Sequence, residues 1–199
     1  MSLPTARSLL AQRTGRLHLS GIREMMAAAA KIPDVIRLEV GEPDFETPAY
    51  ILDAVKHDLD SGQYTHYTPV AGYPELRRAV AARMQHDNGL TVDPDSELMI
   101  SVGGAGALYA AVMAVVDPGD EVLVPDPGYP QYTQMTLLAE GRPVYYPLRE
   151  ENAFVPDVAD MRERVSARTK AILLNSPQNP TGGVIGKPGD DAGTAKYLR

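Results

Sequence analysis

Three glycines stand between an apolar run and a helix-like run, where they could bind an anion. The stretch SVGGAGALYAAV places Gly103, Gly104 and Gly106 at this junction. Free backbone N–H groups and the positive end of a helix dipole converge at such a turn, which suits a phosphate or carboxylate. A nucleotide-hydrolase phosphate loop would continue with Lys and Ser or Thr, but Ala107 and Leu108 stand there instead. The turn therefore predicts an anion site of another kind.

Two other interpretations of the glycine turn stay open. Gly104 and Gly106 match the first two glycines of a dinucleotide-binding fingerprint, and Asp126 lies about 20 residues further on. Tyr109 stands at the third glycine position, where a large side chain opposes close packing of helix and strand. The turn could also join a strand to a helix without binding any ligand.

A second polar feature is the stretch NSPQNPTGG, residues 175 to 183, which follows the apolar run AILL. Pro177 and Pro180 restrict the backbone of the residues before them, and an Asn-Pro bond adopts the cis form at modest cost. The corner can therefore be rigid without regular backbone hydrogen bonds. Asn-Pro and Pro-Thr-Gly are also common in ordinary surface turns, and that interpretation remains open.

The elements that must position these features follow from apolar periodicity. Helical spacing predicts helices over residues 48–60 and 74–89, which end at Gly62 and Gly89. From residue 98, short apolar strands alternate with helices, and the predicted strands are LMISV, EVLVP, PVYYPL and KAILLN. Such alternation predicts an α/β domain built from β-α-β units, with helices on both faces of the sheet.

The composition limits the classes of function. The chain has 199 residues, of which 44% are hydrophobic and 23% charged, as in folded globular proteins. A formal net charge of −7 without clustered Lys and Arg disfavours a nucleic-acid partner. Cysteine is absent and the four histidines are scattered, so neither a disulfide nor a metal site is expected. The longest apolar run is too short to cross a bilayer, and the cytoplasm is the simplest location.

Five segments occur in a fixed order along the chain: GEPDFETP, YTHYTPVAGYPELR, SVGGAGAL, DPGDEVLVPDPGYPQY and NSPQNPTGG. Together they resemble the N-terminal half of a class I/II aminotransferase, a pyridoxal 5'-phosphate enzyme of fold type I. The resemblance implies a truncated large domain over residues 48–185, with three α/β/α layers and a mainly parallel sheet. It also implies an N-terminal arm and small-domain segment over residues 1–47 and an irregular tail over residues 186–199.

The resemblance implies roles for five cofactor-binding residues. The backbone amides at Gly104, Ala105 and Gly106 would hold the cofactor phosphate, and Ala105 brings no hydroxyl where many relatives have Ser or Thr. Tyr129 would stack on the cofactor ring. Asn179 would donate a hydrogen bond to the phenolic oxygen of that ring and help to keep it ionised. A tyrosine in an apolar context also serves in cores and interfaces, so that alternative stays open for Tyr129.

Two further residues match positions with other roles in the family. Tyr67, in HYTPVAG, matches the tyrosine that reaches across a homodimer to the partner's cofactor phosphate. Gly41, which starts GEPDF, matches the backbone position that contacts the substrate carboxylate, although it could be an ordinary strand-ending glycine. The partners implied are an amino acid, a 2-oxo acid and a second copy of the chain, without nucleic acid or membrane.

The resemblance also implies which groups are missing. In the family, the Schiff-base lysine, an aspartate for the pyridine nitrogen and an arginine for the substrate carboxylate all follow the NPTG corner. None of the five lysines stands in the required context: Lys31, Lys56, Lys170, Lys187 and Lys196. We therefore expect no catalytic residue here and no transamination by this chain alone, as for an incomplete gene copy.

The expected function of the completed protein is transfer of an amino group from an amino acid to a 2-oxo acid. The segments HYTPVAG and SGIREMM favour the branch that acts on aspartate, aromatic amino acids and alanine. A β-lyase on the same scaffold and a noncatalytic cofactor-binding or regulatory module remain alternatives.

Overall fold

The computed structural model describes residues 10–17 and 21–186, which fall into two compact units. One unit comprises residues 21–107, and the other comprises the described residues 108–186 together with residues 10–17. The first contains α1 (Gly21–Ala29), α2 (Ala49–Ser61), α3 (Pro74–Asn88) and the start of α4 (Gly103–Val115). The second contains the rest of α4 and η2 (Gln12–Arg16), β1 (Glu121–Asp126), α5 (Pro130–Leu138), β2 (Arg142–Pro147), η3 (Glu150–Asn152), α6 (Val158–Arg164) and β3 (Thr169–Ile172). Apart from Gly186, the predicted irregular tail lies outside the described residues.

The helices α2 and α3 confirm the two helices that the apolar spacing of the sequence predicted. Gly62 and Gly89 follow them in the left-handed conformation, each with φ of 67°. Such a backbone strongly favours glycine, which explains why both helices end there. Pro74 opens α3 at its first turn, where its missing N–H has no intrahelical acceptor in any case. In the described part of the chain, no helix has the length and apolar character needed to cross a membrane.

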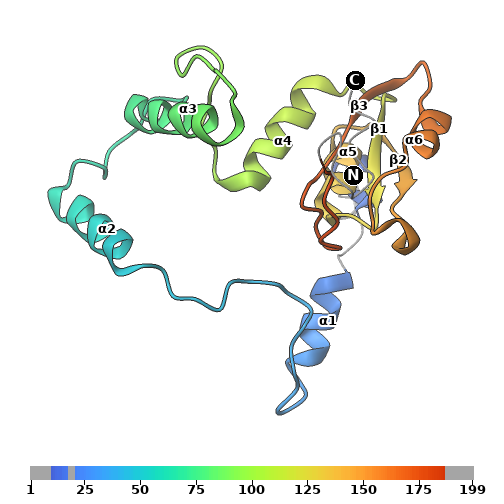
Figure 1. Cartoon of the computed structure of the whole chain (residues 1–199), viewed down its shortest axis with the longest axis horizontal. Coiled ribbons are helices and arrows are strands. Elements are labelled where there is room, and N and C mark those ends of the chain that lie inside the picture. The colour runs from blue at the N-terminus through green and yellow to red at the C-terminus, as the bar shows by residue number, and fades with distance from the viewer. Residues whose placement is uncertain (1–9, 18–20, 187–199) are drawn as a thin grey trace, which may run out of the picture. The chain divides into compact units, whose positions relative to one another are not determined.

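The second unit is organised around a three-stranded parallel sheet in the order β2-β1-β3 (Figure 1). β1 pairs with β2 from Glu121 opposite Arg142 to Asp126 opposite Pro147. The register with β3 shifts between Glu121 and Val122. Because the strands are parallel, their carboxyl ends meet at one edge of the sheet and their amino ends at the other.

Helices cover both faces of this sheet. Val122 and Val124 point into one cluster with side chains of α4 and α5, whereas Leu123 points into a second cluster with α6. Such alternation is the period of a strand that is buried on both faces. The buried members of the clusters are Val112, Val116, Val122, Val124, Tyr132, Met135 and Ala139 on one face and Leu123, Tyr146, Leu148 and Met161 on the other. The predicted α/β layering is therefore confirmed.

Two sequence predictions need correction near residue 100. The run LMISV was expected to form a strand, but residues 98–102 have no strand assignment, and Val102 is 96% exposed. Its backbone makes one bond outward, from the Ile100 amide to the Ala71 carbonyl. A strand requires a neighbour along its whole length, and no described segment supplies one here. In addition, α4 begins at Gly103, so the glycines form its first turn rather than a loop before it.

A buried carboxylate, Glu121, joins the amino ends of the three strands. The residue is 1% exposed, and it accepts hydrogen bonds from Arg142 Nη2 at 2.6 Å and Arg168 Nη2 at 2.8 Å. Ser166 Oγ donates a further bond at 2.6 Å. Arg142 opens β2, and Arg168 and Ser166 precede β3. A shift of β2 or β3 would break its contact with Glu121, and an unpaired buried charge is strongly destabilising. These contacts therefore hold the three strands in register at this edge.

Hydrogen bonds from Ser166, then from Arg142 and Arg168, lower the pKa of Glu121 from its ordinary value of 4.5 to about 2. A carboxyl whose pKa is depressed on folding stabilises the fold above its unfolded pKa. That contribution is lost as the pH falls from about 4.5 towards about 2.

We predict that Glu121→Gln lowers the thermal unfolding midpoint at pH 7, because it removes the charge that both arginines face. The difference from the unchanged chain shrinks as the pH approaches 3, where the carboxylate loses its advantage. Circular dichroism melts at both pH values measure it. Glu163→Gln, at an exposed position of α6, is the matched control. Equal midpoints for the two variants at pH 7 would contradict the role of Glu121.

Candidate functional site

The predicted phosphate-binding turn lies in the unit of residues 21–107. Gly103 has φ of +67°, and the chain then enters α4 directly. α4 starts at Gly103, so the amide N–H groups of Gly104 and Ala105 belong to its first turn, where a helix has no acceptor of its own to offer, and Gly106 follows them. A Cβ added at Gly104 would meet no atom within 4 Å. The turn therefore presents first-turn backbone donors and open space to an anion.

The predicted corner of residues 175–183 follows the carboxyl end of β3. Asn175 Oδ1 accepts a hydrogen bond from the Asn179 amide at 2.8 Å. Gln178 N donates to the Gly183 carbonyl at 2.8 Å, and Gly182 N donates to the Gln178 carbonyl at 2.7 Å. The Ser176-Pro177 and Asn179-Pro180 bonds are cis. The corner is thus closed by its own hydrogen bonds, which the proline content alone did not predict.

The side chain of Asn179 is exposed, and its carboxamide has no hydrogen-bond partner in the part of the chain that the structure describes. Its backbone, in contrast, is held by Asn175. A fixed backbone with an uncommitted amide is an arrangement that presents a donor to a ligand.

Tyr129 follows the carboxyl end of β1 and is the N-cap residue of α5. Its half-buried ring packs against the first core cluster and makes an edge-to-face contact with Tyr132, with 5.5 Å between ring centroids. Burial, followed by the nearby Tyr129, raises the pKa of Tyr132. Within the described residues the Tyr129 hydroxyl has no hydrogen bond. One edge of the ring is therefore fixed by the core, while the phenol remains uncommitted.

The structure brings Tyr129 and Asn179 to the same edge of the sheet, because they follow neighbouring parallel strands. Gln178 Nε2 donates to the Pro127 carbonyl at 3.0 Å and so joins the two segments directly. Gln178 and Asn175 were not identified from the sequence. A polar residue enclosed by Pro177 and Asn179 gave no signal of burial, although Gln178 is only 5% exposed.

Gly41 and Tyr67 both lie in the unit of residues 21–107 and are exposed. No atom lies within 4 Å of a Cβ added at Gly41, and Tyr67 has no contact that holds its ring. Their assigned roles towards substrate and a second subunit stay predictions.

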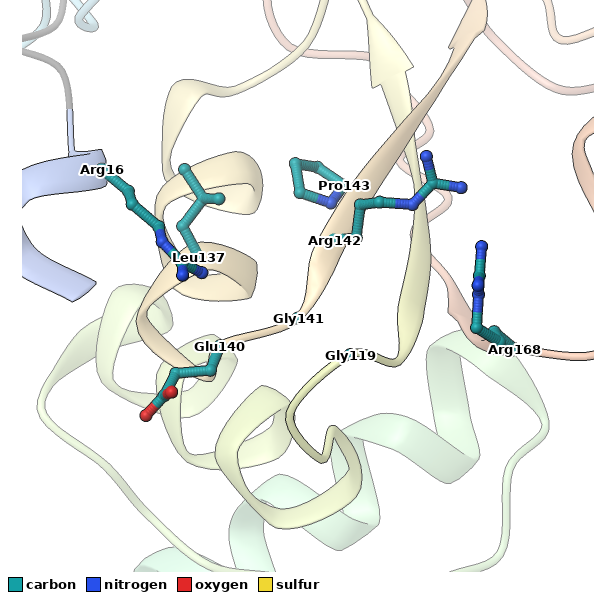
Figure 2. Close-up of a pocket in the computed structure, with 8 residues that line it drawn as sticks. All are labelled: Arg16, Gly119, Leu137, Glu140, Gly141, Arg142, Pro143 and Arg168. Carbon is teal, nitrogen blue, oxygen red and sulfur yellow. The ribbon is translucent and has the colours of Figure 1, made fainter. Parts of the chain in front are cut away.

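A separate pocket of about 460 Å³ lies at the opposite, amino-terminal edge of the sheet (Figure 2). Arg142 and Arg168 at this pocket are paired with Glu121, and Glu140 is paired with Arg13. Open parallel sheets bind their ligands outside the carboxyl ends of the strands. The lining residues are Arg16, Gly119, Leu137, Glu140, Gly141, Arg142, Pro143 and Arg168, and none is a predicted site residue. The described residues also contain no cluster of three or more His, Cys, Asp or Glu placed for a metal ion.

The fold agrees with the comparisons to known proteins. Residues 33–188 match the family model for aminotransferase class I and II, and the chain belongs to that family. It is 42% identical to an aspartate aminotransferase of Pyrococcus horikoshii over 89% of this chain and 45% of that protein. It is 38% identical to aromatic-amino-acid aminotransferase 2 of Thermococcus litoralis over 89% of this chain and 46% of that protein.

Solved structures give the same result. An aspartate aminotransferase from Thermus thermophilus with maleate superimposes with a TM-score of 0.84 at 38% identity, over 90% of this chain and 47% of that one. An alanine aminotransferase from Pyrococcus furiosus gives a TM-score of 0.84 at 34% identity, over the same shares of the two chains. The chain spans about half the length of the curated relatives it matches.

Gly128, directly before Tyr129, has no room for a side chain, since an added Cβ would lie 2.4 Å from the Pro125 carbonyl oxygen. We predict that Gly128→Ala lowers the free energy of unfolding by about 1–3 kcal/mol, because the backbone that carries Tyr129 must move. Gly104→Ala, where the space is open, leaves it unchanged or slightly raised. Urea unfolding measures both variants. A Gly128→Ala chain as stable as Gly104→Ala would show that this segment is not tightly packed.

Proposed function

We propose that this chain is the cofactor-binding part of a pyridoxal 5'-phosphate-dependent aminotransferase that moves an amino group from an amino acid to a 2-oxo acid. The observation that carries the proposal is the pair of Tyr129 and Asn179 at the carboxyl ends of neighbouring parallel strands. Each presents a polar group without a partner in the described part of the chain. The names of its relatives support aspartate, aromatic amino acids and alanine as the class of substrate.

The free donors of the first turn of α4 fit the cofactor phosphate. Gly104 and Ala105 offer first-turn N–H groups, Gly106 follows them without a side chain, and the positive end of the helix dipole favours a dianion. Ala105 supplies no hydroxyl, so phosphate binding rests on the backbone and on the dipole.

The carboxyl-edge residues fit the cofactor ring. Tyr129 offers an aromatic face held at one edge by Tyr132, and an electron-poor pyridinium suits such a face. Asn179 offers a carboxamide donor that can stabilise an ionised phenolic oxygen on the ring. Pyridoxal phosphate, when bound, supplies an electron sink for negative charge on the substrate Cα. The role of this chain is to hold and orient the pyridoxal phosphate.

The remaining assignments belong to the same proposal. Gly41 leaves backbone free for the substrate carboxylate, and the fully exposed Tyr67 is available to the cofactor phosphate of a second subunit in a homodimer. Residues 48–185 would be the large-domain part and residues 1–47 the arm and small-domain segment of a cytoplasmic enzyme.

The three lysines of the described residues have no surroundings that fit the role of covalent cofactor attachment. Lys170 lies in β3 next to the residue paired with Glu121, at the amino end of the strand and away from Asn179. Lys56 is paired with Asp53 on the exposed surface of α2. Lys31 is exposed in the segment after α1, and Lys187 and Lys196 lie outside the described residues.

We therefore expect the purified chain to bind pyridoxal phosphate reversibly. The visible spectrum of the cofactor should change on binding. Mass spectrometry after borohydride reduction should find no stoichiometrically modified lysine. A single lysine labelled to one equivalent would contradict the assignment of no catalytic residue, and absence of any saturable binding would contradict the proposed function.

Substitutions at Ala105 can test phosphate binding without lowering the stability of the fold. Ala105→Glu places a carboxylate at the first turn of α4, where it interacts favourably with the helix dipole. We predict unchanged or raised thermal stability together with a loss of pyridoxal phosphate affinity on the order of tenfold or more, because the carboxylate repels the phosphate.

Ala105→Ser is the matched variant, since it adds a hydroxyl donor at the same position and should raise the affinity by a few-fold. Absorbance titrations with pyridoxal phosphate measure both variants. If Ala105→Glu binds the cofactor as tightly as the unchanged chain, the phosphate does not bind at this turn.

A further inference from the structure

Gln178 is the one buried residue of the corner formed by residues 175–183, with 5% of its surface exposed. Its immediate neighbours Pro177 and Asn179 are both exposed. A buried carboxamide is costly unless it is hydrogen-bonded, and Gln178 Nε2 meets this requirement by donating to the Pro127 carbonyl at 3.0 Å. The side chain therefore points inward, to a segment 51 residues away in the chain.

The backbone of Gln178 also closes the corner. Its amide donates to the Gly183 carbonyl, and its carbonyl accepts from the Gly182 amide. The next residue, Asn179, is held through its own amide by Asn175 Oδ1. The position of the Asn179 carboxamide thus depends on where Gln178 anchors the corner.

The other end of this anchor lies two residues before Tyr129. Within the described residues, Gln178 Nε2 to Pro127 O is the hydrogen bond that joins the corner to the segment of residues 127–129. The same segment lies close to β1, since a Cβ added at Gly128 would lie 2.4 Å from the Pro125 carbonyl oxygen. This hydrogen bond therefore links the positions of the two residues assigned to the cofactor ring.

We propose that Gln178 is a positioning residue for the cofactor ring, because its buried amide fixes the Asn179 corner against the Tyr129 segment. This inference rests on the proposed function, since the ring must bind between these residues. Gln178 itself touches no reacting atom. Its effect is transmitted through Asn179 and Tyr129, and it should be confined to ligands that contact the ring.

Gln178→Glu is the sharpest substitution, because it keeps the size of the side chain and replaces the N–H donor by a carboxylate that faces a carbonyl. We expect the affinity for pyridoxal phosphate at pH 8 to fall on the order of tenfold, as for loss of one buried hydrogen bond with repulsion added. The affinity for inorganic phosphate, measured by competition, should not change. Gln63→Glu, the same exchange at an exposed position, is the matched control.

A pH series adds a measurement that a general loss of stability would not reproduce. The introduced carboxyl is buried, so its pKa is raised, and in its protonated form it can donate to the Pro127 carbonyl. The affinity ratio between the unchanged chain and Gln178→Glu should therefore approach one as the pH falls from 8 to 5.5. A ratio that stays constant over this range overturns the proposed hydrogen bond.

A double-mutant cycle tests transmission through the corner. In an Asn179→Ala background, Gln178→Glu should cost clearly less affinity than in the unchanged chain, because one of the two positioned groups is gone. Additive losses overturn the positioning role. If the unchanged chain binds no pyridoxal phosphate, the proposed function fails; if it binds and Gln178→Glu binds equally well, only this inference fails.

Gln178→Met covers the case in which the carboxylate prevents folding. It fills the same space without a donor, so a folded variant with weakened cofactor binding and unchanged phosphate binding supports the proposal. A Gln178→Met chain that does not fold overturns it, since Gln178 would then hold the whole unit rather than the corner.

Discussion

The ion pairs of Glu121 with Arg142 and Arg168 are the constraint on which the rest of the sheet depends. They join the amino ends of all three strands around one buried carboxylate. The strands are parallel, so a register that is fixed at their amino ends also fixes how their carboxyl ends lie next to one another at the opposite edge. The segments that carry Tyr129 and Asn179 are therefore set side by side by contacts a strand length away.

The polar groups at the two edges of the sheet differ in whether they have partners. At the amino edge the charged groups are paired with one another, as with Arg142 and Glu121. At the carboxyl edge the polar groups of Tyr129 and Asn179 have no partner in the described part of the chain. The paired charges and the proposed ligand site thus lie at opposite ends of the strands, in the way that open α/β sheets place their sites. Gln178 belongs to both, since its buried amide stabilises the corner that presents Asn179.

The sequence predicted the elements whose signals are local. Helix periodicity with Gly62 and Gly89 gave α2 and α3, and apolar runs gave β1, β2 and β3. Features that depend on distant partners were missed. The pairing of Glu121 with Arg142 is an example, although a charged residue next to each strand start was a usable signal in a parallel sheet. The run at residues 98–102 failed for the opposite reason, because an apolar pattern does not supply the neighbour that a strand needs.

The central proposal is that the carboxyl edge of the sheet, and not the arginine-lined pocket at the amino edge, binds the cofactor ring. The most direct measurement is a titration of the ¹⁵N-labelled chain with pyridoxal 5'-phosphate, followed by NMR. We predict saturable shifts of the Tyr129 backbone amide and of the Asn179 side-chain amide, with the same dissociation constant. Shifts confined to Arg16, Arg142 and Arg168, or no saturable shift at all, would contradict it.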